Sequence, residues 1–121
     1  MTDISKCERV VTEQAVFYLG ESNEQYSDGY LELAPHTSLT IHNREGSIEN
    51  LTQSSGKCVM IVFDTEQGTN HLLHEGDGLT IKPEGAWHIH SNPFDETSIT
   101  YWKFDGDIRN VIDAIRNGGK E

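Results

Sequence analysis

The chain is 121 residues long and carries 20 acidic against 9 basic side chains, which gives a formal net charge of −11 at pH 7. This length suits a single domain, and the acidic balance disfavours nucleic acid and anionic membranes as partners, because both attract basic proteins. The sequence contains no apolar run of about 18 residues and no N-terminal secretory signal, so we expect neither a membrane span nor export.

Ten short segments rich in β-branched and aromatic residues follow one another along the chain, separated by Gly, Pro, Asn, Asp and Ser. The predicted strands are residues 9–13, 15–20, 29–34, 38–43, 47–52, 57–64, 70–75, 78–83, 86–91 and 98–104. Strands at this rhythm, with no helices between them, predict a β-sandwich or a β-barrel.

The strand predicted at residues 57–64 (KCVMIVFD) is apolar at both odd and even positions. Successive side chains of a strand point to opposite faces, so this pattern predicts burial on both faces. In a barrel this small, the outer face can be buried against a second subunit. We therefore predict a homodimer.

Only the C-terminal segment departs from the β pattern. Ile108, Val111, Ile112 and Ile115 lie at i, i+3, i+4 and i+7, which predicts an amphipathic helix over about residues 107–117. Asp107 lies at its start, and Gly118 suits its C-terminal end. We expect this helix to pack across the outside or the open end of the barrel, in a structural role.

Two cysteines, Cys7 and Cys58, are far apart and form neither a CxxC motif nor a zinc-finger spacing. Free thiols are typical of a reducing compartment, which predicts a cytoplasmic protein. Cys58 lies in the most apolar predicted strand, where we expect an inert buried thiol.

Six histidines are many for this length, and His88 and His90 are separated by one residue in a predicted strand. Residues two apart on a strand point to the same side, so these two imidazoles face the same way. Neutral imidazole is the commonest metal ligand, and carboxylates join it at zinc, iron, manganese or nickel centres. The pair is therefore either a metal-binding element inside a barrel or two polar side chains in water.

Two segments carry the spacing of a known family. The matches to G(X)5HXH(X)3–4E(X)6G and G(X)5PXG(X)2H(X)3N are His42, Arg44, Glu49 and Gly56 in the first, and Pro83, Gly85, His88 and Asn92 in the second. The leading glycine of the first motif is absent, that of the second is offset, and Arg44 stands where a second histidine is usual. On these residues the chain resembles a small single-domain cupin over roughly residues 29 to 104.

The resemblance implies an all-β double-stranded β-helix, a jelly-roll barrel of two antiparallel sheets, with the C-terminal helix added to one domain. In metal-binding cupins, the histidines and glutamate of the first motif and the histidine of the second hold one ion. By this resemblance His42, Glu49 and His88 keep ligand roles. Arg44 cannot replace the remaining histidine, because a guanidinium group has no lone pair to offer a metal.

Two interpretations of the altered site stay open. In the first, His90 supplies the missing ligand, so that His42, Glu49, His88 and His90 bind a divalent Fe, Mn, Ni or Zn ion while Arg44 contacts an acidic substrate. In the second, no metal is bound, and Arg44 forms an ion pair with Glu49 across the cavity.

The remaining candidates also have structural interpretations. Tyr101 is a candidate substrate-binding or proton-transfer residue, or else part of the barrel wall. The side chains of Trp87 and Trp102 are large enough to wall a pocket, although core packing or a subunit contact is the usual role of tryptophan in a small barrel. The other histidines are predicted to lie in a turn (His36) and at a solvated hairpin end (His71 and His74).

Three functions are compatible with these features. The first is a metal-dependent enzyme of the isomerase or dioxygenase type that acts on a small polar or anionic metabolite. The second is a metal-free module that binds a small molecule. The third is a structural homodimer whose cavity is filled by side chains. The cupin frame hosts so many activities that the sequence leaves open whether the protein is an enzyme.

Overall fold

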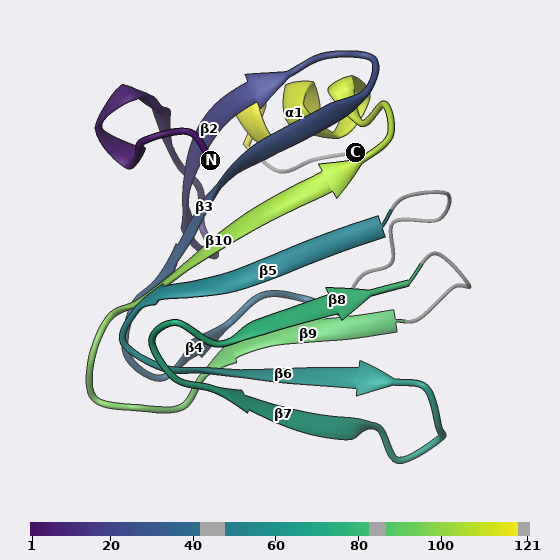
Figure 1. Ribbon diagram of the computed structural model, residues 1–121. Helices are drawn as coiled ribbons and strands as arrows, with labels where there is room; N and C mark the ends of the chain where they lie inside the picture. Colours follow the sequence, from purple (N-terminus) through teal and green to yellow (C-terminus); the bar gives the residue numbers. More distant parts are fainter. Residues whose placement is uncertain (42–47, 83–86, 119–121) are drawn as a thin grey trace.

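The computed structural model describes residues 1–41, 48–82 and 87–118, which form two antiparallel sheets, a short 3₁₀ turn at Ile4–Lys6 and one C-terminal helix (Figure 1). The six-stranded sheet contains, in order, β1 (Glu8–Val11), β2 (Val16–Ser22), β3 (Tyr26–Leu33), β10 (Ser98–Asp105), β5 (Ile48–Ser55) and β8 (Gly78–Ile81). The four-stranded sheet contains β4 (Thr37–Ser38), β9 (Trp87–Asn92), β6 (Cys58–Phe63) and β7 (Thr69–Leu73). The predicted all-β architecture of two antiparallel sheets is confirmed.

The predicted strand at residues 38–43 differs from the structure, in which β4 covers only Thr37–Ser38. Beyond β4, the backbone N–H and the hydroxyl of Thr40 both donate to the side-chain oxygen of Gln14 at 2.9 Å. The backbone N–H of Leu39 still donates to the His90 carbonyl of β9 at 2.9 Å. At Thr40 the backbone N–H bonds to the Gln14 side chain, not to a strand.

The two sheets face each other, and the alternation of side chains along each strand fills the space between them. On β10, Trp102 and Phe104 point inward, because both are buried in the hydrophobic core. On β6, Cys58 and Met60 are fully buried. The outward side chains of β6 are only partly covered in the single chain. The burial that the sequence predicts for both faces of β6 is therefore complete on one face only.

The C-terminal helix α1 (Arg109–Arg116) lies beside β2 and β3 (Figure 1). Its apolar stripe packs into the core, with Ile112 only 2% exposed. Gly118 follows the helix with a φ of 91°, a left-handed conformation that glycine adopts without strain, and its N–H donates to the Ile115 carbonyl. Asp107 precedes the N-cap position, and its carboxylate accepts a hydrogen bond from the backbone N–H of Arg109.

The N-terminal residues are held to the outer face of the six-stranded sheet by one buried carboxylate. Asp28 is 2% exposed and accepts hydrogen bonds from the backbone N–H and the hydroxyl of Thr2. The backbone N–H of Glu21 and the hydroxyl of Tyr101 donate to the same carboxylate. No helix in the described ranges has the length and apolar character needed to cross a membrane.

Candidate metal centre

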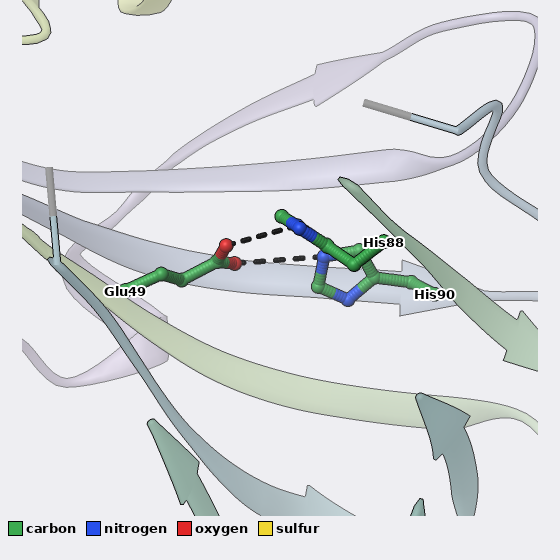
Figure 2. Close-up of side chains that lie close together, drawn as sticks. All are labelled: Glu49, His88 and His90. Carbon is green, nitrogen blue, oxygen red and sulfur yellow. Dashed lines mark ion pairs between the residues drawn. The ribbon is translucent and has the colours of Figure 1, made fainter. Parts of the chain in front are cut away.

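A buried cluster of one carboxylate and two imidazoles lies between the two sheets (Figure 2). Glu49 projects inward from β5, next to Phe104 of β10 in the sheet register. His88 and His90 project from β9 in the opposite sheet, because positions two apart on a strand share a face. The strand alternation of both sheets therefore brings these three side chains together.

The carboxylate of Glu49 lies between the two imidazoles. Its Oε2 atom is 3.0 Å from Nε2 of His88, and its Oε1 atom is 3.5 Å from Nε2 of His90. The two imidazole rings meet edge to face, with their centroids 5.3 Å apart. Each oxygen of the carboxylate thus faces a different histidine, as Figure 2 shows.

All three side chains are almost inaccessible to solvent, with residue exposures of 3% for Glu49, 1% for His88 and 3% for His90. Burial by itself would raise the pKa of Glu49, because a low dielectric disfavours the charged form. Hydrogen bonds from the two histidines outweigh burial and hold the pKa of Glu49 well below its ordinary value. The site therefore contains a buried anion that requires a positive or hydrogen-bonding partner.

The donor set fits a transition-metal ion. One ligand atom from each of the three residues lies within 4.8 Å of the others. Metal–ligand bonds of about 2.0–2.2 Å would place neighbouring ligand atoms roughly 3 Å apart, which small side-chain rotations can reach. Two imidazoles and one carboxylate are typical of iron, manganese, nickel and zinc sites. Within the described ranges, no other three His, Cys, Asp or Glu side chains gather in this way.

The predicted site residues have different outcomes. Glu49, His88 and His90 lie together, so the two histidines that the sequence singles out do face the barrel interior. His42 and Arg44 lie outside the described residues, as do Pro83 and Gly85 of the second motif. A ligand role for His42, a substrate role for Arg44 and the alternative ion pair between Arg44 and Glu49 stay predictions.

Tyr101, the other predicted substrate-binding residue, lies on the face of β10 opposite to Trp102. Its hydroxyl donates to Asp28 at 2.8 Å, and its ring packs edge to face on Tyr30. Burial, and then the bond to the Asp28 carboxylate, raise its pKa above the ordinary tyrosine value. The structure does not bring Tyr101 to the Glu49 cluster.

The other motif residues that the structure describes have structural roles. Gly56 has a φ of 67°, and a Cβ atom there would lie 2.4 Å from the carbonyl oxygen of Thr97. Asn92 is fully buried at the end of β9, and its amide donates to the backbone carbonyls of Leu33, Ala34 and Glu96. Both residues fix the chain where the two sheets meet, away from the carboxylate.

Two histidines predicted to lie away from the site do so. His36 pairs with Asp95 at 2.6 Å on the exposed surface. The side chain of His74 is 62% exposed and lies close to Asp77 in the turn that follows β7. Their positions are consistent with the turn and hairpin-end roles that the sequence predicts.

A cavity of about 520 Å³ opens beside the cluster, with Glu49 and His90 in its lining. Trp102 and Phe104 contribute its wall on the sheet side, and Ile112 contributes from α1. The interior beside Glu49 is therefore open, which runs against a barrel filled by side chains. The sequence leaves open whether α1 packs across the outside or the open end of the barrel and predicts only a structural role, so its place in the cavity wall is not evident before the structure.

A six-stranded and a four-stranded antiparallel sheet, closed around an inward carboxylate and two inward imidazoles, define a double-stranded β-helix barrel with a candidate metal site. Several solved structures share this fold. An uncharacterised double-stranded β-helix protein from Klebsiella pneumoniae matches with a TM-score of 0.75 at 15% identity, over 89% of this chain and 90% of its own. The cupin domain of Cnp3 from Schizosaccharomyces pombe matches with a TM-score of 0.73 at 15% identity, over 98% of this chain and 80% of its own.

A predicted oxalate decarboxylase from Thermotoga maritima also matches, with a TM-score of 0.73 at 15% identity, over 88% of this chain and 98% of its own. No family model matches the sequence, and no curated protein is significantly similar to it. The chain therefore has the fold of a small cupin, as its two motif segments predict, and at these identities the likeness establishes the fold alone.

Proposed function

We propose that Glu49, His88 and His90 bind one divalent transition-metal ion, with His42 as the fourth ligand. The observation that carries this proposal is a carboxylate buried between two imidazoles beside an open cavity. Both imidazoles turn Nε2 toward Glu49, so the atoms that would ligate an ion already converge. Iron, manganese, nickel and zinc all suit this donor set.

The proposed activity is that of a metal-dependent enzyme of the isomerase or dioxygenase type. When bound, the ion would supply Lewis acidity toward a substrate oxygen. Glu49 offsets part of its charge, and the two neutral histidines fix its position. The three side chains are almost inaccessible to solvent, which strengthens electrostatic interactions at the site. The proposed substrate is a small molecule whose oxygen-containing head group can reach the ion, where Arg44 would contact an acidic group.

Elemental analysis of purified protein tests this proposal. After incubation with excess Fe²⁺, Mn²⁺, Ni²⁺ or Zn²⁺ and desalting, we expect close to one ion per chain. Glu49→Gln, which keeps the side-chain shape, and His88→Ala should each weaken binding by more than about 100-fold, the upper end of the loss for an outer-shell partner. His74→Ala, an exposed histidine outside the cluster, is the matched control and should bind as the wild type does.

Two further variants separate the ligand sets. If His42 and His90 are both ligands, His42→Ala and His90→Ala should each weaken binding. If His42→Ala weakens metal binding and His90→Ala does not, His90 lies near the ion without binding it. Wild-type protein that stays metal-free with all four ions would contradict the proposal.

A metal-free binding module is the second candidate function. The imidazoles of both histidines already lie 3.0 and 3.5 Å from the carboxylate of Glu49, so a barrel without an ion would not leave this carboxylate isolated. The cavity could then bind a small molecule directly. Metal-free protein that retains a small molecule in this cavity, seen in a crystal structure, would favour this function over the first.

We also propose that two copies of the chain pair through the outer face of the four-stranded sheet. The outward side chains of its described strands are all uncharged: Ser38, Val59, Ile61, Phe63, Asn70, Leu72, Trp87, Ile89 and Ser91. Leu72 is 49% exposed and Trp87 51% exposed. In a chain with a net charge of −11, two copies repel each other least where neither presents charge, and a twofold axis would bring this face against itself.

Sedimentation equilibrium tests this pairing. We expect the wild type to be a dimer and Leu72→Glu to be a monomer, because the change places like charges against each other in the interface. Val11→Glu is the matched control, since Val11 is 63% exposed on β1 of the other sheet. A monomeric wild type, or equal dissociation of the two variants, would contradict the proposal.

A cytoplasmic location stays a proposal that is supported by the thiols. The structure leaves both Cys7 and Cys58 unpaired. Free thiols are usual in a reducing compartment and uncommon in secreted proteins of this size. Fractionation of cells that express the untagged protein would test this location.

A further inference from the structure

The cavity beside the metal centre has two chemically different sides. Glu49 and His90 form its polar end at the metal centre, and Thr12, Glu13, Gln14 and Thr40 add further polar lining. Large apolar residues form the remaining wall, with Phe17, Leu31 and Trp102 from the six-stranded sheet and Ile112 from α1. Its volume of about 520 Å³ lies within the range of about 300–1,000 Å³ that is typical of small-molecule sites.

The charges around the cavity restrict what it can bind. Glu13 and Glu49 are the charged residues among the described residues that line it, and both are acidic. The described lining contains no lysine or arginine. An anionic part of a ligand would therefore find no cationic side chain along the apolar wall. Arg44 lies outside the described residues, and its predicted place is near the motif ligands. An anionic group would therefore be bound at the metal end, and the rest of the ligand would lie against apolar side chains.

Helix α1 gives the apolar side its depth. Val111, Ile112 and Ile115 line the cavity from α1 and face Phe17 and Leu31 of the sheet. Ala114, which also lines it, leaves room where a larger residue would fill the space. A compact polar metabolite would gain little from this wall, because the α1 side chains that line the cavity offer its hydrogen-bonding groups only hydrocarbon.

We infer that the ligand of this site is amphipathic, with a metal-binding oxygen head at Glu49 and His90 and an aromatic or branched apolar body between Trp102 and α1. This inference rests on the proposed metal site for the head group, and it replaces the small polar metabolite expected from the sequence with a molecule that buries an apolar body. The apolar body supplies affinity through its removal from water, and the metal end fixes its orientation.

Two hydroxamates that differ only in their body test the inference. Acetohydroxamate and benzohydroxamate share a metal-chelating head, and the second carries an apolar phenyl ring where the first has a methyl group. Titration calorimetry would measure their affinity for Zn²⁺-loaded protein, with their affinities for free Zn²⁺ as the reference. Burying a ring of this size should make benzohydroxamate bind at least about tenfold tighter after this correction. Equal affinities would overturn the inference.

A variant of α1 tests where the ring of benzohydroxamate binds. Ala114→Leu fills the cavity from α1 and should remove most of the gain from the ring. Asn110→Leu, on an exposed position of the same helix, is the matched control and should keep the gain. A ring gain that is equal in Ala114→Leu and the wild type would place the ring elsewhere and overturn the inference.

Two measurements distinguish a failure of this inference from a failure of the metal proposal. The Zn²⁺ titration, made first and without hydroxamate, reports on the metal site alone. If no ion binds, the two probes are compared on metal-free protein by chemical-shift titration. A ring-dependent gain that Ala114→Leu removes would then support the apolar site although the metal proposal had failed. Equal shifts for both probes would overturn the inference there as well.

Discussion

The carboxylate of Glu49 and the imidazole of His88 come from opposite sheets, yet Oε2 and Nε2 lie 3.0 Å apart in a site that is closed to solvent. Thirty-eight intervening residues separate them in sequence, so only closure of the barrel brings them into contact. Such a contact couples the chemistry of the site to the integrity of the fold. Metal binding should therefore be visible in the stability of the whole domain.

We predict that Zn²⁺ stabilises the protein against heat. An ion that binds only the folded state, at 100 times its dissociation constant, adds about 2.7 kcal/mol, which corresponds to a rise in Tm on the order of 10 °C for a domain of this size. Differential scanning calorimetry with Zn²⁺ or with EDTA would measure it. The rise in Tm should be absent in Glu49→Gln and present in His74→Ala. If the wild type unfolds at the same temperature with Zn²⁺ and with EDTA, the metal site is contradicted.

Stability should fall in acid because of Asp28. Burial would raise the pKa of this carboxyl, but hydrogen bonds from Tyr101, Thr2 and the Glu21 amide outweigh it and hold the pKa below the ordinary value. A group whose pKa is lower in the folded state stabilises the fold above its unfolded pKa of about 4, and this contribution is lost as the pH falls toward the folded value.

Asp28→Asn should therefore destabilise the protein by about 1–3 kcal/mol at pH 7, the range for hydrogen bonds to a charged group. The difference from the wild type should shrink as the pH falls from about 4 toward the lowered pKa of folded Asp28, because the unfolded chain binds a proton there first and the folded protein only at lower pH. Urea unfolding at a series of pH values would measure both effects. Asp113→Asn, on the exposed face of α1, is the control, and a difference for Asp28→Asn that does not change with pH would contradict the prediction.

Gly29 should not tolerate a side chain. A Cβ atom at this position would lie 2.1 Å from the carbonyl oxygen of Tyr18 and 2.6 Å from the ring of Trp102. Gly29→Ala should cost about 1–3 kcal/mol, the range for overpacking a core. Gly78→Ala, where the nearest atom would be 3.3 Å away, should cost less. Chemical denaturation measures both free energies of unfolding, and equal costs would contradict the prediction, because they would require both the Tyr18 backbone and the Trp102 ring to move without penalty.

The two thiols should react at very different rates. Cys58 is fully buried, and burial raises its pKa to about 11. At pH 8 about one-thousandth of such a thiol is ionised, and its inaccessibility slows the reaction further. DTNB should therefore titrate Cys7 in the native protein and both thiols in concentrated guanidinium chloride. Cys7→Ser should remove the fast phase, and a fast phase that persists in this variant would show that Cys58 is accessible.

Much of the fold could be predicted because the signals are local. Alternating apolar residues separated by turn residues indicate the strands, and the spacing of Ile108, Val111, Ile112 and Ile115 indicates the helix. Of the strand predicted at 38–43, only Ser38 lies in β4 among the described residues 38–41, and Thr40 donates hydrogen bonds to Gln14, which is distant in sequence. Local propensity carries no information about such a contact.

The sequence by itself determined that His88 and His90 share a face, because the two-residue period of a strand requires it, and the motif spacing paired His88 with Glu49 while a ligand role for His90 stayed open. The tertiary structure decided that this face points inward and that the pair meets Glu49 from the opposite sheet. Tertiary structure alone also placed Tyr101 on the other face, against Asp28, and α1 over the cavity. Periodicity fixes the direction of a side chain relative to its own strand, whereas the group that it meets depends on how the sheets close.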